Sequence, residues 1–412
     1  MLIQAKKTSQ DGSDTLRLTA SDHDERHNEI ELNSKIHFPK ILPYRRTPLT
    51  GIHFSDQGET TPYKMLEKLR SLGLDRYTSP YLCDSNVIIF TLNEKYAEKL
   101  VPSRDTTGLA LLLNLNPVER ADDLEREIIL AMLAAPIPLS FPSYEEFSAA
   151  LHIRCQIVWA ARRTQLAFHT SEAERPSDFW TYVTGCGFTV LPGKSLIEAL
   201  VKATQPENSE GKLYSFSCYR ATEYVILLAI ARVLAQVNPI LLDQLQAQWE
   251  QRPIMSGEYH EVFLREYGSL EQPLPSGYYI PGDRVWFRNP DEKSSNASGY
   301  EGSWVIYLGE GLFSNFWNRD KPYTLKEKCV EIFHWRHAVY PDSEGESRIN
   351  EQVVAGLVSQ TMANQTHLER VLRVMKLIRD PKGVYADGGC IDASREFPRY
   401  VGIGATDIVL PE

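Results

Sequence analysis

The chain has 412 residues, of which 42% are hydrophobic and 24% charged, and this composition is typical of a folded globular protein. Its 54 acidic residues outnumber its 44 basic residues, and the resulting net charge of −10 excludes non-specific nucleic-acid binding as a main function. Its apolar runs are too short to cross a membrane, and residues 1–10 lack the apolar core of a secretory signal peptide. We therefore expect a cytoplasmic protein without a membrane anchor, and secretion that needs no cleaved signal is the open alternative.

The cysteines are scattered along the chain and include no Cys-x-x-Cys pair. This spacing favours free thiols in a reducing compartment over a disulfide framework or a zinc site. Two histidines of the polar N-terminal tail, His23 and His27, have no fixed scaffold around them, and we interpret both as solvated. We expect no metal ion and no cofactor. The cysteines are Cys83, Cys155, Cys186, Cys218, Cys329 and Cys390.

The N-terminal third divides into two predicted parts. Residues 1–38 are polar and are predicted to form a flexible tail. Residues 39–136 mix helical and strand patterns, which predicts an α+β module. This module could be a pro-region, a substrate-recruiting domain or a partner-binding domain, and the sequence leaves that choice open. Its predicted elements are helices at residues 61–72 and 121–134 and strands at residues 87–92 and 109–115.

A proline-rich stretch, residues 136–142, marks the start of the next predicted domain, residues 137–345. Two capping boxes, each a serine followed three residues later by a glutamate, predict helices that begin after Ser143 and Ser195. Further along, short apolar or alternating runs separated by turn residues predict strands. The predicted helices are residues 144–166, 196–204, 221–234 and 239–249, and the predicted strands are 179–183, 278–280, 284–287 and 303–308.

The last part of the chain is predicted to form a C-terminal helical extension and tail, residues 346–412. Before it, the pattern of residues 326–337 is ambiguous, and we interpret it as ending in a strand. A helix is predicted over residues 353–378, with a break near Asn364, and a short strand over residues 400–403.

The chain is organised around Cys218, which follows a short turn rich in aromatic and hydroxyl side chains. The next stretch, residues 221–234, is mostly apolar and has no Gly or Pro, which predicts a buried helix with Cys218 in its first turn. The unpaired N–H groups and the positive dipole end at that position favour a thiolate over a thiol. Because a cysteine nucleophile reacts as the thiolate, we predict that Cys218 is a nucleophile. A buried structural cysteine is the alternative.

Three sequence blocks follow one another in a characteristic order. They are Phe216-Ser217-Cys218-x-x-Ala221-Thr222-x-x-Val225-Ile226, Pro281-Gly282-Asp283-x-x-Trp286-Phe287-x-Asn289-Pro290, and Glu301-Gly302-Ser303-Trp304-Val305-Ile306-Tyr307-Leu308-Gly309-Glu310. In order and spacing they resemble the spore-type protein-glutamine γ-glutamyltransferases, the transglutaminases of Bacillus spores. There the corresponding motifs are Phe-Glu-Cys-Ala-Thr-Ala, Gly-Asp-Cys-Leu-Tyr-Phe-Lys-Asn-Pro and Gly-Glu-Asn-Val-Ile-Tyr-Leu-Gly-Glu-Asp. With the preceding helix and strand, the resemblance covers about residues 140–340.

The resemblance implies an α+β fold with a papain-like or NlpC/P60-like core, in which helices pack on an antiparallel sheet. It also implies a bacterial, calcium-independent enzyme whose cysteine attacks the side-chain amide of a glutamine. Ammonia leaves, and a lysine amine resolves the thioester, or water does so and the product is deamidated. The implied partners are proteins with accessible glutamine and lysine side chains, with no nucleic acid and no membrane, and no oligomeric state is implied.

Carried over by position, the family's nucleophile is Cys218, but its other catalytic groups are replaced. The strand glutamate aligns with Ser303, two positions after Glu301, and the histidine position falls on Asn315 or Phe316. The loss matters because general acid–base help is worth about 10²–10⁴-fold in rate.

Three hypotheses accommodate the missing histidine. In the first, His334 acts as the base from the next strand with Glu301 as its partner, and alternation places His334 and His337 on opposite faces of that strand. In the second, the site is degenerate, and the chain is an interaction protein that kept the fold and lost the base. In the third, the chain is a cysteine amidase or peptidase of related fold.

Aromatic side chains near the second and third blocks are candidates for substrate binding. They could line a tunnel for a long glutamine or lysine side chain, and packing in the core is an equal alternative. The candidates are Trp286, Tyr300, Trp304 and Phe316.

Overall fold

The centre of the structure is an antiparallel sheet whose strands run in the order β13-β12-β11-β10-β16-β9. The computed structural model describes residues 50–55, 60–82, 87–168, 173–185, 187–207, 211–379 and 389–411, all within one compact unit, residues 44–412. The strands are β9 (Leu264–Tyr267), β10 (Arg284–Arg288), β11 (Gly302–Gly309), β12 (Leu312–Phe313), β13 (Tyr323–Thr324) and β16 (Arg395–Pro398).

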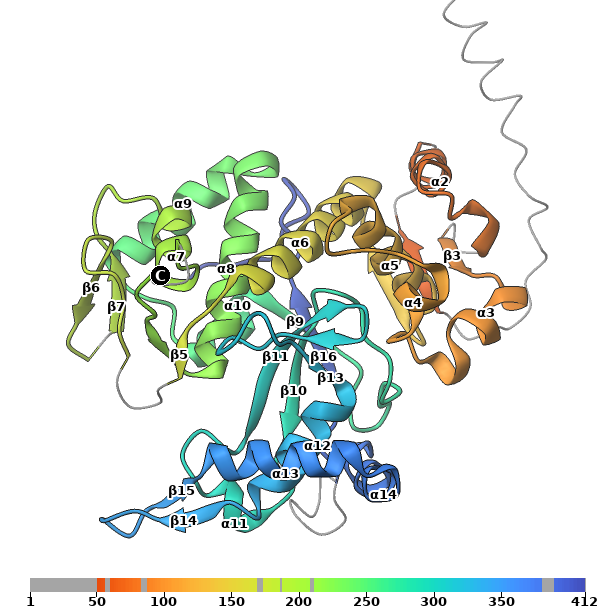
Figure 1. The fold of residues 1–412 in the computed structure, drawn as a ribbon. Helices are drawn as coiled ribbons and strands as arrows, with labels where there is room; N and C mark the ends of the chain where they lie inside the picture. Colours follow the sequence, from red (N-terminus) through yellow and green to blue (C-terminus); the bar gives the residue numbers. More distant parts are fainter. Residues whose placement is uncertain are drawn as a thin grey trace, which may run out of the picture. The chain divides into compact units, whose positions relative to one another are not determined.

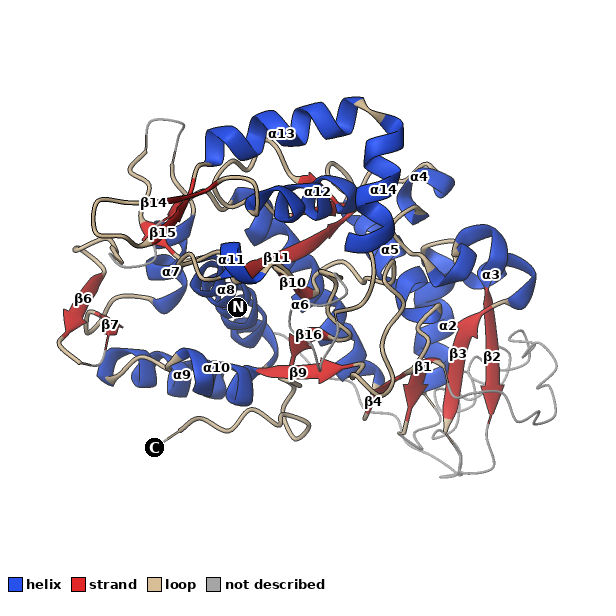
Figure 2. Cartoon of the chain, turned by 90° about the horizontal axis from the view of Figure 1, so that it is seen from below, coloured by secondary structure: helices blue, strands red, loops and turns tan. Residues whose placement is uncertain are grey.

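Helices cover both faces of this sheet (Figure 1). Along β11, Ile306 and Leu308 pack into one core and Val305 and Tyr307 into the other, because alternate residues of a strand face opposite sides. The first core joins the sheet to α6 (Tyr144–Arg163), α7 (Leu196–Thr204), α8 (Cys218–Val237) and α9 (Pro239–Gln251). The second joins it to α12 (Leu325–Trp335), α13 (Glu351–Ala363) and α14 (Gln365–Met375), which lie together in Figure 2.

Helix α8 lies deep in the first core. From Ala221 to Leu234 its side chains are almost all inaccessible to solvent, as expected of a helix that is apolar on every side. Its N-cap is Ser217, whose Oγ accepts a hydrogen bond from the backbone N–H of Arg220 at 3.3 Å. The helix therefore starts at Cys218, immediately after the short strand β8 (Ser215–Phe216).

The N-terminal part of the described chain has its own sheet, with strand order β2-β3-β1-β4. Its elements are β1 (Gly51–Phe54), α2 (Thr61–Ser71), β2 (Thr78–Leu82), β3 (Ile88–Leu92), α3 (Glu94–Leu100), α4 (Leu109–Leu113), α5 (Ala121–Leu133) and β4 (Pro138–Phe141). Smaller elements are β5 (Ala167–Phe168), β6 (Trp180–Val183), β7 (Gly187–Val190), α10 (Ser256–Phe263), α11 (Glu292–Ser295), β14 (Val339–Pro341) and β15 (Ser347–Ile349). Two short 3₁₀ helices cover Asp75–Tyr77 and Pro102–Arg104.

Most of the predicted elements are confirmed, including the capped starts of α6 and α7 and the break between α13 and α14 at Asn364. Four predictions were wrong. Most of the apolar run at residues 109–115 forms helix α4, because a short apolar run without alternation does not by itself distinguish a helix from a strand. Residues 326–337 lie mainly in helix α12, which a capping box of Thr324 and Glu327 starts. Residues 278–280 and 400–403 form no strand.

Cys155, Cys218, Cys329 and Cys390 are free thiols, and Cys83 and Cys186 lie outside the described residues, as do His23, His27 and the predicted tail. The sulfur atoms of Cys329 and Cys390 are 3.6 Å apart in the second core. Within the described ranges, no helix combines the length and the apolar character needed to cross a bilayer. The internal domain boundaries near residues 136 and 345 stay predictions.

A buried carboxyl group links α5 to the turn between β11 and β12. Glu127 accepts a hydrogen bond from the backbone N–H of Glu310 at 2.9 Å and another from the Tyr307 hydroxyl at 3.5 Å. Gly309 in this turn has a φ of +85°, and a Cβ there would lie 2.5 Å from Glu127 Oε2, so the turn requires glycine. Burial raises the pKa of Glu127 to about 7; the Glu310 N–H and the Arg162 guanidinium oppose this rise, and the Glu310 carboxylate adds to it.

This link predicts a specific pH dependence of stability. A carboxyl group with a higher pKa in the folded than in the unfolded state stabilises the fold only while it is protonated. We expect the free energy of unfolding to fall as the pH rises from about 4.5 to about 7, by about 3 kcal/mol from Glu127 alone. The variant Glu127→Gln should lose this slope in urea unfolding measured across that range. An equal slope in Glu127→Gln and the wild type, with the exposed Glu301→Gln as control, would contradict it.

Candidate functional site

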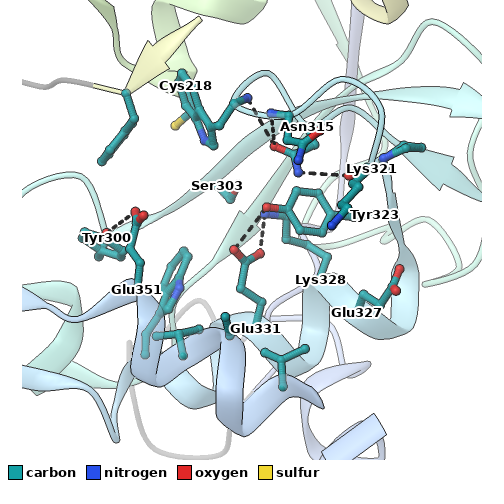
Figure 3. A pocket seen from close by; sticks show the side chains of 18 of the residues that line it. Cys218, Tyr300, Ser303, Asn315, Lys321, Tyr323, Glu327, Lys328, Glu331 and Glu351 are labelled. Atoms are coloured by element: carbon teal, nitrogen blue, oxygen red, sulfur yellow. Dashed lines mark hydrogen bonds and ion pairs between the residues drawn. The ribbon is translucent and has the colours of Figure 1, made fainter. Parts of the chain in front are cut away.

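Cys218 opens onto a pocket of about 450 Å³. The residue is partly exposed, whereas Cys155, Cys329 and Cys390 are buried. Helix α8 presents Cys218 at one side of the pocket, and the start of β11 places Gly302 and Ser303 beside it (Figure 3). The pocket is therefore built where the first turn of the buried helix meets the central sheet.

The opposite wall of the pocket comes from α12 and α13. Lys328, Glu331 and Trp335 of α12 all line it, and residues at these spacings lie on one face of a helix. The loop between β12 and β13 adds Asn315 and Trp317. The remaining lining residues are Phe168, Gly299, Tyr300, Asn318, Lys321, Pro322, Tyr323, Glu327, Glu351, Val354, Ala355, Val358 and Ser359.

The charged groups in the pocket are paired in a definite way. The Lys328 ammonium donates to Glu331 Oε2 at 2.6 Å and lies 3.9 Å from the centroid of the Tyr323 ring. The Tyr323 hydroxyl donates to the other oxygen of Glu331 at 3.3 Å. Lys328 is only 3% exposed, so this ammonium is held away from bulk water by one carboxylate and one aromatic ring. In the view of Figure 3, Ser303 and the end of the Lys328 side chain lie between Cys218 and Glu331.

The Cys218 sulfur experiences two opposing influences. Burial raises the pKa of the thiol above its ordinary value, because the apolar surroundings disfavour the thiolate. A hydrogen bond from the backbone N–H of Trp304 and the positive charge of Lys328 lower the pKa, but burial outweighs them. Burial thus acts on the pKa of Cys218 in the direction opposite to the start of the helix, and its effect is larger.

The network behind Cys218 is charged and buried. Arg284 stacks on the rings of Tyr219 and Trp304, with its guanidinium carbon 4.4 and 3.9 Å from their centroids. Glu223, one helical turn further along α8, accepts a hydrogen bond from Arg220 at 2.8 Å and is 1% exposed. The contacts of Arg284 hold the first turn of α8 against β10 and β11, and so they position the sulfur.

His334, the predicted base, does not line the pocket. Residues 325–335 are helical, and His334 lies on the side of α12 that faces α13 and α14, not on the side of Lys328 and Glu331. Its Nε2 is 2.7 Å from the Thr361 hydroxyl, and its Nδ1 is 3.1 Å from Nδ1 of His337. The two histidines thus lie side by side, so their predicted placement on opposite faces of a strand was wrong. Burial, with His337 next in effect, lowers the pKa of His334 to about 4.

The other predicted site residues divide between the pocket and its surroundings. Tyr300 lines the pocket and donates to Glu351 at 2.9 Å. Glu301 is exposed beside the turn at Gly299 and does not line the pocket. The remaining three do not line it either. Trp286 and Trp304 stack on each other with centroids 5.6 Å apart, and Phe316 is buried in the first core.

Lys328, Glu331 and Tyr323 are pocket residues that our sequence analysis missed. A signal for them was present, since Thr324-x-x-Glu327 is a capping box and a helix after it places Lys328 and Glu331 one turn apart. Among the described residues, no histidine lines the pocket. In the same part of the chain, no three His, Cys, Asp or Glu side chains are grouped to hold a metal ion.

The fold and the site together define a class: an α+β protein in which a partly exposed cysteine begins a buried helix beside an antiparallel sheet. Residues 111–383 match the family described as TGL: Protein-glutamine gamma-glutamyltransferase, and the chain belongs to this family. The resemblance seen in the motifs is thereby confirmed, and the match extends beyond residues 140–340 on both sides.

Individual relatives are distant. A protein-glutamine gamma-glutamyltransferase of Halalkalibacterium halodurans is 24% identical over 194 residues, which cover 46% of this chain. The match spans 62% of the length of that relative. A solved structure of a transglutaminase from Geobacillus stearothermophilus, without its C-terminal extension, is 22% identical, with 53% of this chain and 98% of that chain covered and a TM-score of 0.35.

The partial exposure of Cys218, compared with the other described cysteines, predicts selective labelling. In the native protein, iodoacetamide should modify Cys218 well before Cys155, Cys329 or Cys390, which are at most 2% exposed. Because burial raises the pKa of the Cys218 thiol, the labelling rate should still be rising at pH 9. Peptide mass spectrometry of samples quenched over time would follow each cysteine. A plateau below pH 8, or equal rates at Cys218 and Cys155, would contradict the structure.

Proposed function

We propose that the chain is a protein-glutamine γ-glutamyltransferase that uses Cys218 to form a thioester with a glutamine side chain. The observation that carries the proposal is that Cys218, the residue aligned with the family nucleophile, opens onto the pocket from the first turn of the buried helix α8. A lysine amine of a second protein would then resolve the thioester. Water would give deamidation in its place.

The geometry around Cys218 suits a slender amide side chain. The pocket of about 450 Å³ has an aromatic lining that includes Tyr300 and Trp317, which would pack against the aliphatic part of a glutamine. The backbone N–H of Trp304 donates to the sulfur and would help to stabilise the thiolate before it attacks. We infer that the core is papain-like, with α8 as the cysteine helix and β10 to β12 as the opposing sheet.

The proposed reaction starts from a minor ionised form of the thiol. Because burial raises the pKa of Cys218, most sulfur is protonated at neutral pH, and the rate of the first step should rise as the pH rises. The family histidine position is occupied by Phe316 or Asn315, so proton transfer must involve other groups. Protein substrates with accessible glutamine and lysine side chains, without nucleic acid, are part of the proposal, as is activity without calcium.

A second candidate function is binding of a protein side chain without turnover. One observation favours it: Phe316 is 2% exposed in the apolar core, and no histidine among the described residues takes its place at the pocket. The pocket and its charged wall would then serve recognition alone.

Amine incorporation tests the proposal directly. We expect the wild type to attach a fluorescent primary amine to casein, with a rate that increases from pH 7 to pH 9. Cys218→Ala should abolish incorporation, because the thioester cannot form, while Cys155→Ala should retain it, because Cys155 is buried in α6.

Release of ammonia measured in parallel separates the outcomes. Ammonia release without amine incorporation, abolished in Cys218→Ala, would identify a deamidase. If the wild type gives neither signal while a glutamine-containing peptide protects Cys218 from alkylation, the proposal is overturned in favour of binding without turnover.

A further inference from the structure

We propose that Lys328 is the proton-donating catalytic residue of this site and that Glu331 positions it. The inference rests on the proposed acyl transfer and deepens it, because it assigns the role that a histidine fills in the family to an ammonium on α12. The geometry that carries it is the shared pocket: Cys218 and Lys328 line the same cavity from opposite walls.

The burial of Lys328 is unusual for its residue type. Lysine side chains are almost never fully buried unless they are paired, because removing an ammonium from water is costly. Lys328 is 3% exposed, and its charged end faces a cavity wall with Glu331 Oε2 at 2.6 Å. Because a solvated ammonium would avoid this cost, a buried ammonium that shares a pocket with a cysteine is a candidate for function.

Two contacts fix the orientation of this ammonium, and a third fixes its partner. The ammonium donates to Glu331, one helical turn along α12, and lies 3.9 Å from the centroid of the Tyr323 ring. The Tyr323 hydroxyl in turn donates to Glu331 at 3.3 Å. Glu331 thereby has both carboxylate oxygens engaged. A group held in this way keeps its direction when substrate enters, which is what proton transfer at a defined atom requires.

The charge of Lys328 also acts on the nucleophile. Of the side chains that influence the Cys218 sulfur, Lys328 and Arg284 lower the pKa of the thiol, with Lys328 the larger of these two. Because an arginine does not release its proton under ordinary conditions, we assign the proton transfer to Lys328 and not to Arg284. Lys321, the other lysine at the pocket, is not among the groups that act most strongly on the Cys218 thiol.

The proposed sequence of steps is balanced. The Cys218 thiolate attacks the amide carbon, the C–S bond forms, and the carbonyl oxygen takes the negative charge. As the C–N bond breaks, Lys328 gives a proton to the leaving nitrogen, ammonia departs, and the thioester remains with a neutral Lys328. The incoming primary amine then attacks the thioester, Lys328 takes its proton, and the C–S bond breaks to restore the thiolate and the ammonium.

Two substitutions separate the two tasks assigned to Lys328. Lys328→Met removes the charge and the proton, so the midpoint of Cys218 alkylation against pH should move to higher pH, and amine incorporation should fall by about 10²-fold or more. Lys328→Arg keeps the charge but holds its proton, so the alkylation midpoint should stay near the wild type while incorporation falls by a similar factor. If Lys328 had a purely structural role, the alkylation midpoint would not shift in Lys328→Met while staying unchanged in Lys328→Arg.

Lys326→Met is the matched control, since Lys326 is an exposed lysine of the same helix that does not line the pocket, and it should leave both readouts unchanged. Thermal unfolding of each variant checks that the fold is intact. An unchanged alkylation midpoint in a folded Lys328→Met, or full incorporation by Lys328→Arg, would overturn the role of Lys328. If the wild type neither incorporates amine nor releases ammonia, the proposed acyl transfer fails and the proton-donating role with it. By contrast, if the wild type and the Lys328 variants are all active, the proposed acyl transfer stands and only the role of Lys328 fails.

Discussion

The burial of helix α8 on every side is the constraint on which the rest of the structure depends. A helix segment without a polar face has to be covered by protein, and α6, α7, α9 and the sheet cover α8 from Ala221 to Leu234. Cys218, at the start of its first turn, lines the pocket. The same burial that places the sulfur also raises the pKa of its thiol, so position and ionisation oppose each other at this residue.

Buried charged groups offset part of the rise that burial causes in the pKa of the Cys218 thiol. Arg284 on one side of the sulfur and Lys328 across the pocket both favour the thiolate, and each is almost fully buried and paired with a carboxylate. Coulomb interactions in such surroundings are several times stronger than in water. At a solvent-exposed surface, the same charged residues would have little effect on the pKa of the cysteine, because water and salt would screen them.

The elements of the fold that depend on a few neighbouring residues could be predicted from the sequence. Ser143 and Ser195 predict the starts of two helices, and the apolar run after Cys218 predicts a buried helix, because caps and periodicity depend on a few neighbouring residues. The pocket could not be predicted, because it is made by α12 and α13 approaching Cys218 from about a hundred residues away in sequence. The error at His334 had a local cause: interpreted as a strand, residues 326–337 alternate, but as a helix they place Lys328, Glu331 and Trp335 on the pocket face and turn His334 away.

One of the two residues aligned with the family histidine, Phe316, has no room for a polar side chain. Phe316 is packed in the apolar core between the sheet and the helices, and its backbone carbonyl accepts a hydrogen bond from the N–H of Leu166 at 2.7 Å. An imidazole at that position would be buried without a polar partner, which costs free energy unless the surrounding core changes as well. A proton-transfer group on α12 needs no such change, because that helix already faces the cavity with a charged stripe. Packing in the core therefore accounts for the absence of a histidine at Phe316, whereas Asn315, the other aligned position, lines the pocket.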